Sequence, residues 1–118
     1  MSSVAQVILA SGTSSYTQSS RPLVKGYIAL SLIASEPEGY ALACEALATA
    51  KNPDYANIKC TTVIVAGDED KTSPAATTEY LKEQIAGTKA VQLQNVGHWH
   101  MIEDVEGVSG TLKAFLNL

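Results

Sequence analysis

The sequence lacks clustered positive charge and long apolar runs. Lysine and arginine number 8 against 12 aspartates and glutamates, so the net charge is −4, and no run of basic residues forms a patch. Binding to nucleic acid or to an anionic membrane needs such a patch, and we therefore expect neither partner. The longest apolar stretches, such as residues 27–34, are far too short to span a bilayer.

Cysteine is scarce, and no targeting signal is evident. Cys44 and Cys60 are the two cysteines, which allow at most one disulfide and no disulfide framework. No basic residue precedes Arg21, which argues against a secretory signal. The last three residues, Leu-Asn-Leu, do not form a peroxisomal address. We therefore expect a cytoplasmic protein with free thiols.

Large aromatic side chains are also few. Trp99 and Phe115 are the single tryptophan and the single phenylalanine in 118 residues. Hydrophobic residues still make up 46% of the chain, which is ordinary for a globular protein. The length suits one modest domain. We expect a core built from small and aliphatic side chains.

The first half of the chain has the spacing of helices. A weak first helix ends near Gly12, and the serine- and threonine-rich residues 12–20 predict a loop. A second helix begins at Ser20 and Pro22, since proline is tolerated in a first turn. Its predicted apolar face consists of Leu23, Tyr27, Leu30 and Ile33 or Ala34.

A third helix has the clearest start signal. Ser35 to Glu38 fits a capping box with a proline in the first turn. Apolar residues then recur at helical spacing, with Cys44 among them, and residues 52–54 (Asn-Pro-Asp) end the segment. We expect both cysteines to be buried as small hydrophobic residues, Cys44 on the apolar face of this helix and Cys60 at the mouth of a strand.

From Cys60 onward the pattern becomes that of an α/β fold. Residues 61–66 form a β-branched run typical of a strand buried on both faces. A helix over 75–85, a strand over 89–93, a loop over 95–102 and a helix over 103–117 follow. This alternation predicts a parallel sheet with a right-handed crossover. Two strands do not make an independent sheet, so we expect an open strand edge and a chain that is either marginally stable or self-associates through that edge.

Two short polar segments follow the predicted strands. One is residues 67–71 (Gly-Asp-Glu-Asp-Lys), and the other is residues 97–100 (Gly-His-Trp-His). Ligands bind beyond the carboxyl ends of strands in open α/β sheets, and both segments lie there. A carboxylate that meets a histidine at this edge fixes the imidazole tautomer and stabilises the imidazolium.

These segments resemble α/β-hydrolases, in a form like the 3-oxoadipate enol-lactonases. Residues 63–74 resemble the acid segment of that family, and residues 96–99 with Ile102-Glu103 resemble its histidine segment. Residues 39–47 resemble a helix of its cap. The resemblance implies an α/β fold in which 1–56 is a helical cap or lid segment and 57–118 is the C-terminal part of the hydrolase core.

The resemblance also implies a catalytic role for two residues. The family uses a Ser-Asp-His triad in that chain order. Asp70 matches its acid and His98 its base, which would serve first as general base and then as general acid in the hydrolysis of an ester or lactone. No cofactor is implied. Asp68 and Glu69 beside the acid are expected to be solvated.

The nucleophile of that triad has no match in the chain. The family places its serine in a G-x-S-x-G elbow, and no such motif occurs. The closest imitations, residues 12–14 and 108–110, lack the flanking strand and the second glycine. The loop that donates half of the oxyanion hole is also missing. Cys44 has the right chain order for a nucleophile, but an apolar helix face does not activate a thiol.

Two further residues in the histidine segment have alternative interpretations. His98 and His100 have the i, i+2 spacing of a metal-binding pair, but no third ligand has convincing spacing, so we expect no metal. His100 is then a residue of a pocket rim or of the surface. Trp99 either packs under the histidine loop or walls a substrate pocket.

Two hypotheses for the function follow. In the first, the chain is a segment of an ester or lactone hydrolase, truncated or one half of a split enzyme that needs an N-terminal half as partner. In the second, it is a non-catalytic binding or assembly protein derived from a truncated hydrolase. The intact Asp70 and His98 favour the first hypothesis, while the missing serine predicts an inactive isolated chain.

Overall fold

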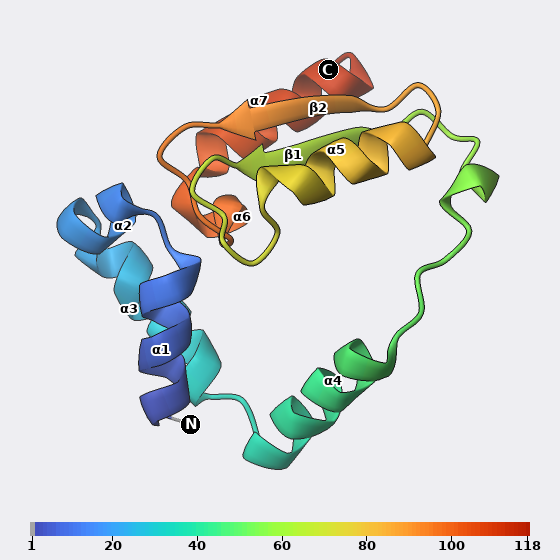
Figure 1. The fold of residues 1–118 in the computed structure, drawn as a ribbon. Helices are drawn as coiled ribbons and strands as arrows, with labels where there is room; N and C mark the ends of the chain where they lie inside the picture. The colour runs from blue at the N-terminus through green and yellow to red at the C-terminus, as the bar shows by residue number, and fades with distance from the viewer. Residues whose placement is uncertain (1) are drawn as a thin grey trace.

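The computed structural model describes residues 2–118 (Figure 1). Helices fill the first half of the chain, and two strand–helix units follow. The helices are α1 (Ser2–Gly12), α2 (Ser15–Ser20), α3 (Pro22–Ile33) and α4 (Pro37–Thr49). A 3-10 turn at Tyr55–Asn57 leads to β1 (Val63–Gly67), α5 (Ala75–Gln84), β2 (Lys89–Leu93), α6 (His100–Glu103) and α7 (Val105–Leu116).

The two strands form a parallel pair. Its register runs from Val63 opposite Lys89 to Gly67 opposite Leu93. Helix α5 covers one face of the pair and α7 the other, as Figure 1 shows. The predicted α/β class and parallel pairing are therefore confirmed. The prediction of a first strand buried on both faces is only partly met, since Val63 to Ala66 are half-buried.

The pair leaves backbone groups unpaired at its edge. Lys89 N–H donates to the Thr62 carbonyl at one end, and Asp68 N–H donates to the Leu93 carbonyl at the other. Alternate residues of a strand bond to the same neighbour in a parallel ladder. The backbone groups of Val63 and Val65 therefore point toward the edge of β1 that β2 does not cover. Such an edge is a template for another strand.

The buried core lies mainly among the N-terminal helices. Ala5 of α1 packs with Ile28 and Leu32 of α3, and each is at most 5% exposed. Partly buried residues pack against this cluster, among them Trp99 and Ile102. The core therefore joins the N-terminal helices to the loop and helix that follow β2. It is made of aliphatic side chains, as predicted.

Two predictions for the N-terminal half are wrong. Residues 15–20 form α2 and not a loop, because Ser14 caps that helix by accepting a hydrogen bond from Thr17 N–H at 3.1 Å. The predicted apolar face of α3 is its exposed face, with Leu23 87% and Leu30 67% exposed. Since α3 is apolar on more than one side, its periodicity alone does not identify the face that α1 covers.

Helix α4 lies away from the strand pair (Figure 1) and has no buried residue, although its half-buried Tyr40 packs against the core of α1 and α3. Its N-cap is Glu36, which makes no side-chain capping bond, while the Ser35 hydroxyl donates back to Ser31. The predicted capping box therefore does not form. Cys44 in α4 and Cys60 before β1 are both exposed, so their predicted burial is wrong, since no other element packs over them.

The short apolar stretches of the sequence predicted no segment long enough to span a bilayer. Among residues 2–118, no helix combines the length and the apolar character needed to cross a bilayer.

A pair of substitutions in α3 tests which face is buried. We expect Ile28→Ala to lower the free energy of unfolding by about 2–4 kcal/mol, because it removes most of a fully buried side chain and leaves a cavity. We expect Leu30→Ala to change it by less than about 0.5 kcal/mol, because that side chain is mostly exposed. Urea titrations followed by far-ultraviolet circular dichroism measure both values. A larger loss in Leu30→Ala than in Ile28→Ala would show that the face predicted from the sequence is the buried one.

The open edge of β1 predicts self-association that grows with protein concentration. Val65→Pro should shift the equilibrium toward monomer, because it removes a backbone donor that points away from β2. Val65→Thr is the control, since it keeps that donor. Analytical ultracentrifugation measures the distribution. A wild-type monomer with a sharp unfolding transition that is independent of concentration would contradict the prediction.

Candidate active site

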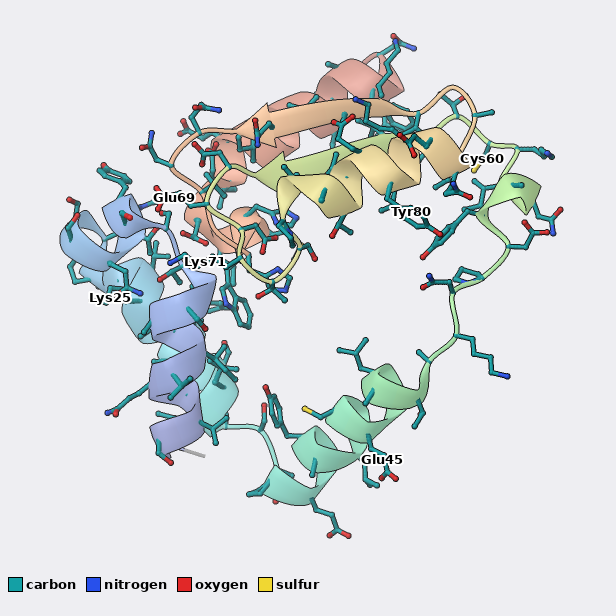
Figure 2. The ribbon with its side chains drawn as sticks, viewed as in Figure 1. Lys25, Glu45, Cys60, Glu69, Lys71 and Tyr80 are labelled. Atoms are coloured by element: carbon teal, nitrogen blue, oxygen red, sulfur yellow. The ribbon has the colours of Figure 1, made fainter. Side chains whose placement is uncertain are left out.

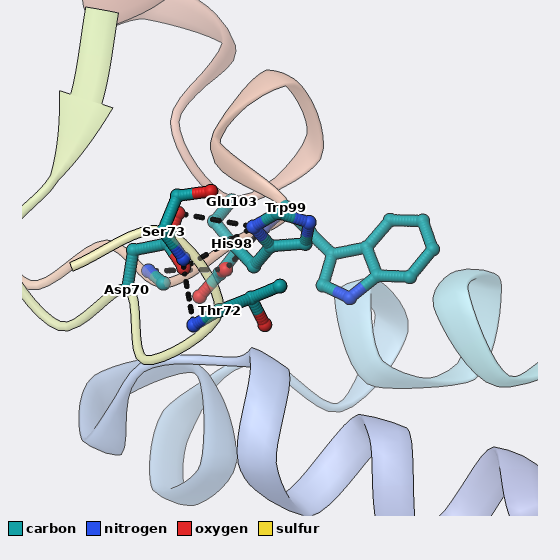
Figure 3. Close-up of polar contacts among 7 residues, drawn as sticks. Asp70, Thr72, Ser73, His98, Trp99 and Glu103 are labelled. Atoms are coloured by element: carbon teal, nitrogen blue, oxygen red, sulfur yellow. Dashed lines mark hydrogen bonds and ion pairs between the residues drawn. The ribbon is translucent and has the colours of Figure 1, made fainter. Parts of the chain in front are cut away.

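The acid and the histidine meet at the carboxyl edge of the strand pair. Asp70 lies in the loop after β1 and His98 in the loop after β2. His98 Nδ1 is 3.0 Å from Asp70 Oδ2 and 3.1 Å from Oδ1 (Figure 3). The Asp70 side chain is 3% exposed and that of His98 is 40% exposed. The structure thus brings together the two residues predicted as a pair.

The surroundings of Asp70 favour its ionised form. Asp70 Oδ1 accepts hydrogen bonds from the backbone N–H groups of Thr72 and Ser73, both at 2.8 Å (Figure 3). Burial raises the pKa of Asp70, but the Ser73 N–H, the His98 ring and the Thr72 N–H together hold it below its usual value. The carboxylate is therefore charged at neutral pH.

An ionised Asp70 sets the tautomer of His98. A carboxylate accepts hydrogen bonds and does not donate them, so the proton of the neutral ring sits on Nδ1. Nε2 then carries the free lone pair, and it makes no hydrogen bond to any residue in 2–118. Since the ring is partly exposed, Nε2 can accept a proton from a group outside the chain.

The two loops are joined directly by hydrogen bonds. Glu69 N–H donates to the Val96 carbonyl at 2.9 Å, and Val96 N–H donates to Asp68 Oδ1 at 3.1 Å. A Cβ at Gly67 would clash with the Val96 carbonyl oxygen, so only glycine allows this approach. Asp68 is exposed, as predicted, and its carboxylate also accepts the hydrogen bond from Val96 N–H in the opposite loop.

Glu69 connects the acid loop to the N-terminal helices. Its Oε2 accepts from the Ser15 N–H at 2.8 Å and the Ser15 hydroxyl at 2.7 Å, and Figure 2 shows it at the gap between this loop and α2. The Ser15 hydroxyl and N–H lower the pKa of Glu69. The prediction of a solvated Glu69 is therefore only partly met, because the residue is half-buried and its carboxylate binds the first residue of α2.

The histidine loop also contacts the end of α1. His98 N–H donates to the Gly12 carbonyl at 2.7 Å. A Cβ at Gly97 would lie 2.6 Å from that carbonyl oxygen and 2.8 Å from Ser14 N. Trp99 packs on the helical core, and its Nε1 would be 3.1 Å from a Cβ at Gly12. Packing is therefore the interpretation of Trp99 that the structure supports.

His100 and the candidate nucleophiles lie outside the pair. His100 starts α6, and its Nδ1 is buried without a partner in the described chain. No group of metal-ligating side chains gathers anywhere in residues 2–118. The Ser14 hydroxyl is used as a helix cap, and the Ser109 hydroxyl donates to the Glu106 carbonyl. Neither hydroxyl hydrogen-bonds to His98.

Glu103 lies beside the pair, and its contacts were not predicted from the sequence. Glu103 is 2% exposed, and its carboxylate accepts from the backbone N–H groups of Ser14, Gly97 and Trp99. In the sequence it is part of the segment that resembles the family's histidine segment, with no contact assigned to it. The signal for its role is the tertiary approach of residues 12–14, which no local pattern contains.

The environment of Asp70 predicts a pH-dependent loss of stability. Because its folded pKa is depressed, the ionised carboxylate stabilises the fold above its usual pKa, and this contribution is lost as the pH falls through the folded pKa. The difference in unfolding free energy between wild type and Asp70→Asn should therefore be largest at neutral pH and shrink in acid. Urea titrations over a pH series measure it. A difference that stays constant would contradict the depressed pKa.

Comparison with curated sequences gives one short similarity. No family model matches the chain. The chain is 37% identical over 54 residues to Lipase 3 of Moraxella sp. (strain TA144). The matched part is 46% of this chain and 17% of that lipase. This chain therefore spans only a small fraction of the curated relative that it matches.

Solved structures match almost the whole chain. An enol-lactonase from Burkholderia xenovorans LB400 has a TM-score of 0.90 at 26% identity, covering 98% of this chain and 45% of its own. A thermophilic esterase from Thermogutta terrifontis has a TM-score of 0.90 at 22% identity, and the match covers 97% of this chain and 43% of the esterase. Est816, an N-acyl homoserine lactone degrading enzyme, has a TM-score of 0.78 at 22% identity, and the match covers 92% of this chain and 45% of Est816. The chain therefore has the fold of the C-terminal part of the esterase and enol-lactonase α/β-hydrolases, as its sequence motifs indicated.

Proposed function

We propose that this chain supplies the acid and the base of a Ser-Asp-His triad that hydrolyses a small ester or lactone. The observation that carries the proposal is the contact of 3.0 Å between His98 Nδ1 and Asp70, which leaves Nε2 without a partner in the described residues. The similarity to an esterase and to lactone-degrading enzymes supports the substrate class.

In this proposal His98 moves protons and Asp70 stabilises the charge that results. His98 Nε2 takes the proton of a serine hydroxyl as the serine oxygen attacks the carbonyl carbon of the substrate. The imidazolium then protonates the departing alcohol oxygen, which in a lactone stays attached to the acyl group. Water attacks the acyl-enzyme, its proton passes to Nε2, and the serine is restored.

The serine must come from residues outside this chain. The hydrolase structures are matched over only 43% and 45% of their length, so more than half of each has no counterpart here. We infer that an N-terminal hydrolase half is the partner and carries the nucleophile and the oxyanion hole. In the assembled enzyme, residues 1–56 would form the cap and 57–118 the end of the core.

Two surfaces of the strand pair suit such a partner. One is the unpaired edge of β1, which offers backbone groups to a further strand. The other is an apolar groove of about 620 Å³ between the sheet and α7, with Val63, Val91 and Phe115 in its wall. In an α/β fold, helices cover the faces of a parallel sheet. A strand and a helix from the missing half would fill both surfaces.

An assay with a chromogenic short-chain ester tests the proposal. We expect no turnover by the isolated chain and turnover when a cognate N-terminal hydrolase half is added in trans. His98→Ala should lower the restored rate by at least about a hundredfold, because the general base is lost. His100→Ala is the matched control, and it should retain the rate because His100 does not contact Asp70.

Two results would contradict this proposal in different ways. Turnover by the isolated chain that disappears in His98→Ala would mean that the nucleophile lies within residues 1–118. Failure of every cognate half to restore turnover would count against a split enzyme and favour the non-catalytic binding or assembly protein.

A further inference from the structure

We propose that Glu103 is a positioning residue for His98, holding the histidine loop in the geometry that the Asp70 pair needs. The inference rests on the proposed function in one respect, since it assigns catalytic value to the orientation of His98. Its physical basis is a buried carboxylate that binds backbone N–H groups on both sides of that histidine.

The burial of Glu103 requires an explanation. Glu103 is 2% exposed. No lysine or arginine side chain in residues 2–118 forms a salt bridge with its carboxylate. A buried carboxylate without an ionic partner is unfavourable unless hydrogen bonds compensate for its lost hydration. Arg21 is close, but its guanidinium donates to the backbone carbonyl of Glu103 and not to the carboxylate.

Backbone donors compensate the buried charge. Glu103 Oε1 accepts from Gly97 N–H at 3.1 Å and from Trp99 N–H at 3.2 Å. Its Oε2 accepts from Ser14 N–H at 2.8 Å. Hydrogen bonds to a charged acceptor are about twice as strong as neutral ones. The carboxylate is thus bound to two segments that are far apart in the sequence.

These bonds restrain the backbone around His98. The N–H groups of Gly97 and Trp99 bind Glu103, and the N–H between them, that of His98, binds the Gly12 carbonyl at 2.7 Å. Three consecutive backbone donors therefore have fixed partners. With the backbone held at both sides, the direction of the imidazole toward Asp70 is set before a substrate arrives. Figure 3 shows Glu103 beside His98 and Trp99.

Glutamine cannot replace glutamate in this position. The carboxylate offers two acceptor oxygens, and donors approach both of them. A carboxamide has one acceptor oxygen and an NH₂ group that only donates. Glu103→Gln would therefore place a donor against an N–H group on one side. It conserves the size of the side chain and removes one set of hydrogen bonds, so it separates hydrogen bonding from packing.

The test is an NMR measurement on the full chain, labelled with ¹⁵N at histidine. The chain has 2 histidines, so a His100→Gln variant assigns the signals. We expect the wild type to show a downfield His98 Nδ1–H signal from the bond to Asp70. That signal should weaken in Glu103→Gln and vanish in Glu103→Ala. It should be unchanged in Glu106→Gln, which removes the same charge from an exposed position three residues away.

Amide exchange in the wild type provides a second measurement that does not depend on how the variants fold. The N–H groups of Ser14, Gly97 and Trp99 should be protected although these residues lie outside helices and strands. In Glu103→Gln, exchange should accelerate about tenfold at one or more of these amides. Rapid exchange at Gly97 and Trp99 in the wild type would overturn the inference.

The outcomes separate this inference from the proposed function. The His98 signal reports the contact with Asp70 without turnover, so a chain that is inactive with every partner would leave the result valid. A full-strength His98 Nδ1–H signal in both Glu103 variants would overturn the positioning role even if the hydrolase assay succeeds. Circular dichroism confirms that each variant compared is folded.

Discussion

Parallel pairing of β1 with β2 is the constraint on which the candidate site depends. Because parallel strands end at the same edge of a sheet, the loops that follow them emerge together. Asp70 and His98 are thereby close enough to bond at 3.0 Å. The close approach at Gly67 and the bond from Val96 N–H to Asp68 then keep the two loops in contact. The electrostatics of the site follow, since a buried and hydrogen-bonded Asp70 stays charged and fixes the tautomer of its partner.

A second group of contacts attaches the N-terminal helices to that edge. Glu69 binds Ser15, Glu103 binds Ser14, and the Gly12 carbonyl binds His98 N–H. Each contact uses a carboxylate or carbonyl oxygen and a backbone donor, and Trp99 adds apolar packing on the core of α1 and α3. The arrangement of the pair therefore depends on residues from both halves of the chain. By contrast, α4 buries none of its residues, so the site does not depend on its position.

The sequence predicted the features that local patterns encode. The strand predicted over residues 61–66 is found as β1, shifted to Val63–Gly67, and the strand predicted at 89–93 is found as β2. Asp70 and His98 could be identified because their motifs lie at the ends of these strands. The aliphatic character of the core also follows from composition, since Trp99 and Phe115 are the single tryptophan and the single phenylalanine. These features depend on steric preferences and periodicities over a few residues.

Only the tertiary structure determined which surfaces meet. Periodicity could not decide whether Leu30 or Ile28 is buried in α3, because that depends on where α1 packs. Residues 15–20 became a helix because Ser14 caps them, and the Ser14 N–H is itself bound by a glutamate far along the chain. The contacts of Glu69 and Glu103 could not be predicted for the same reason. The sequence does not show whether an acidic side chain is solvated or bound, because that depends on whether a backbone donor from another element approaches it.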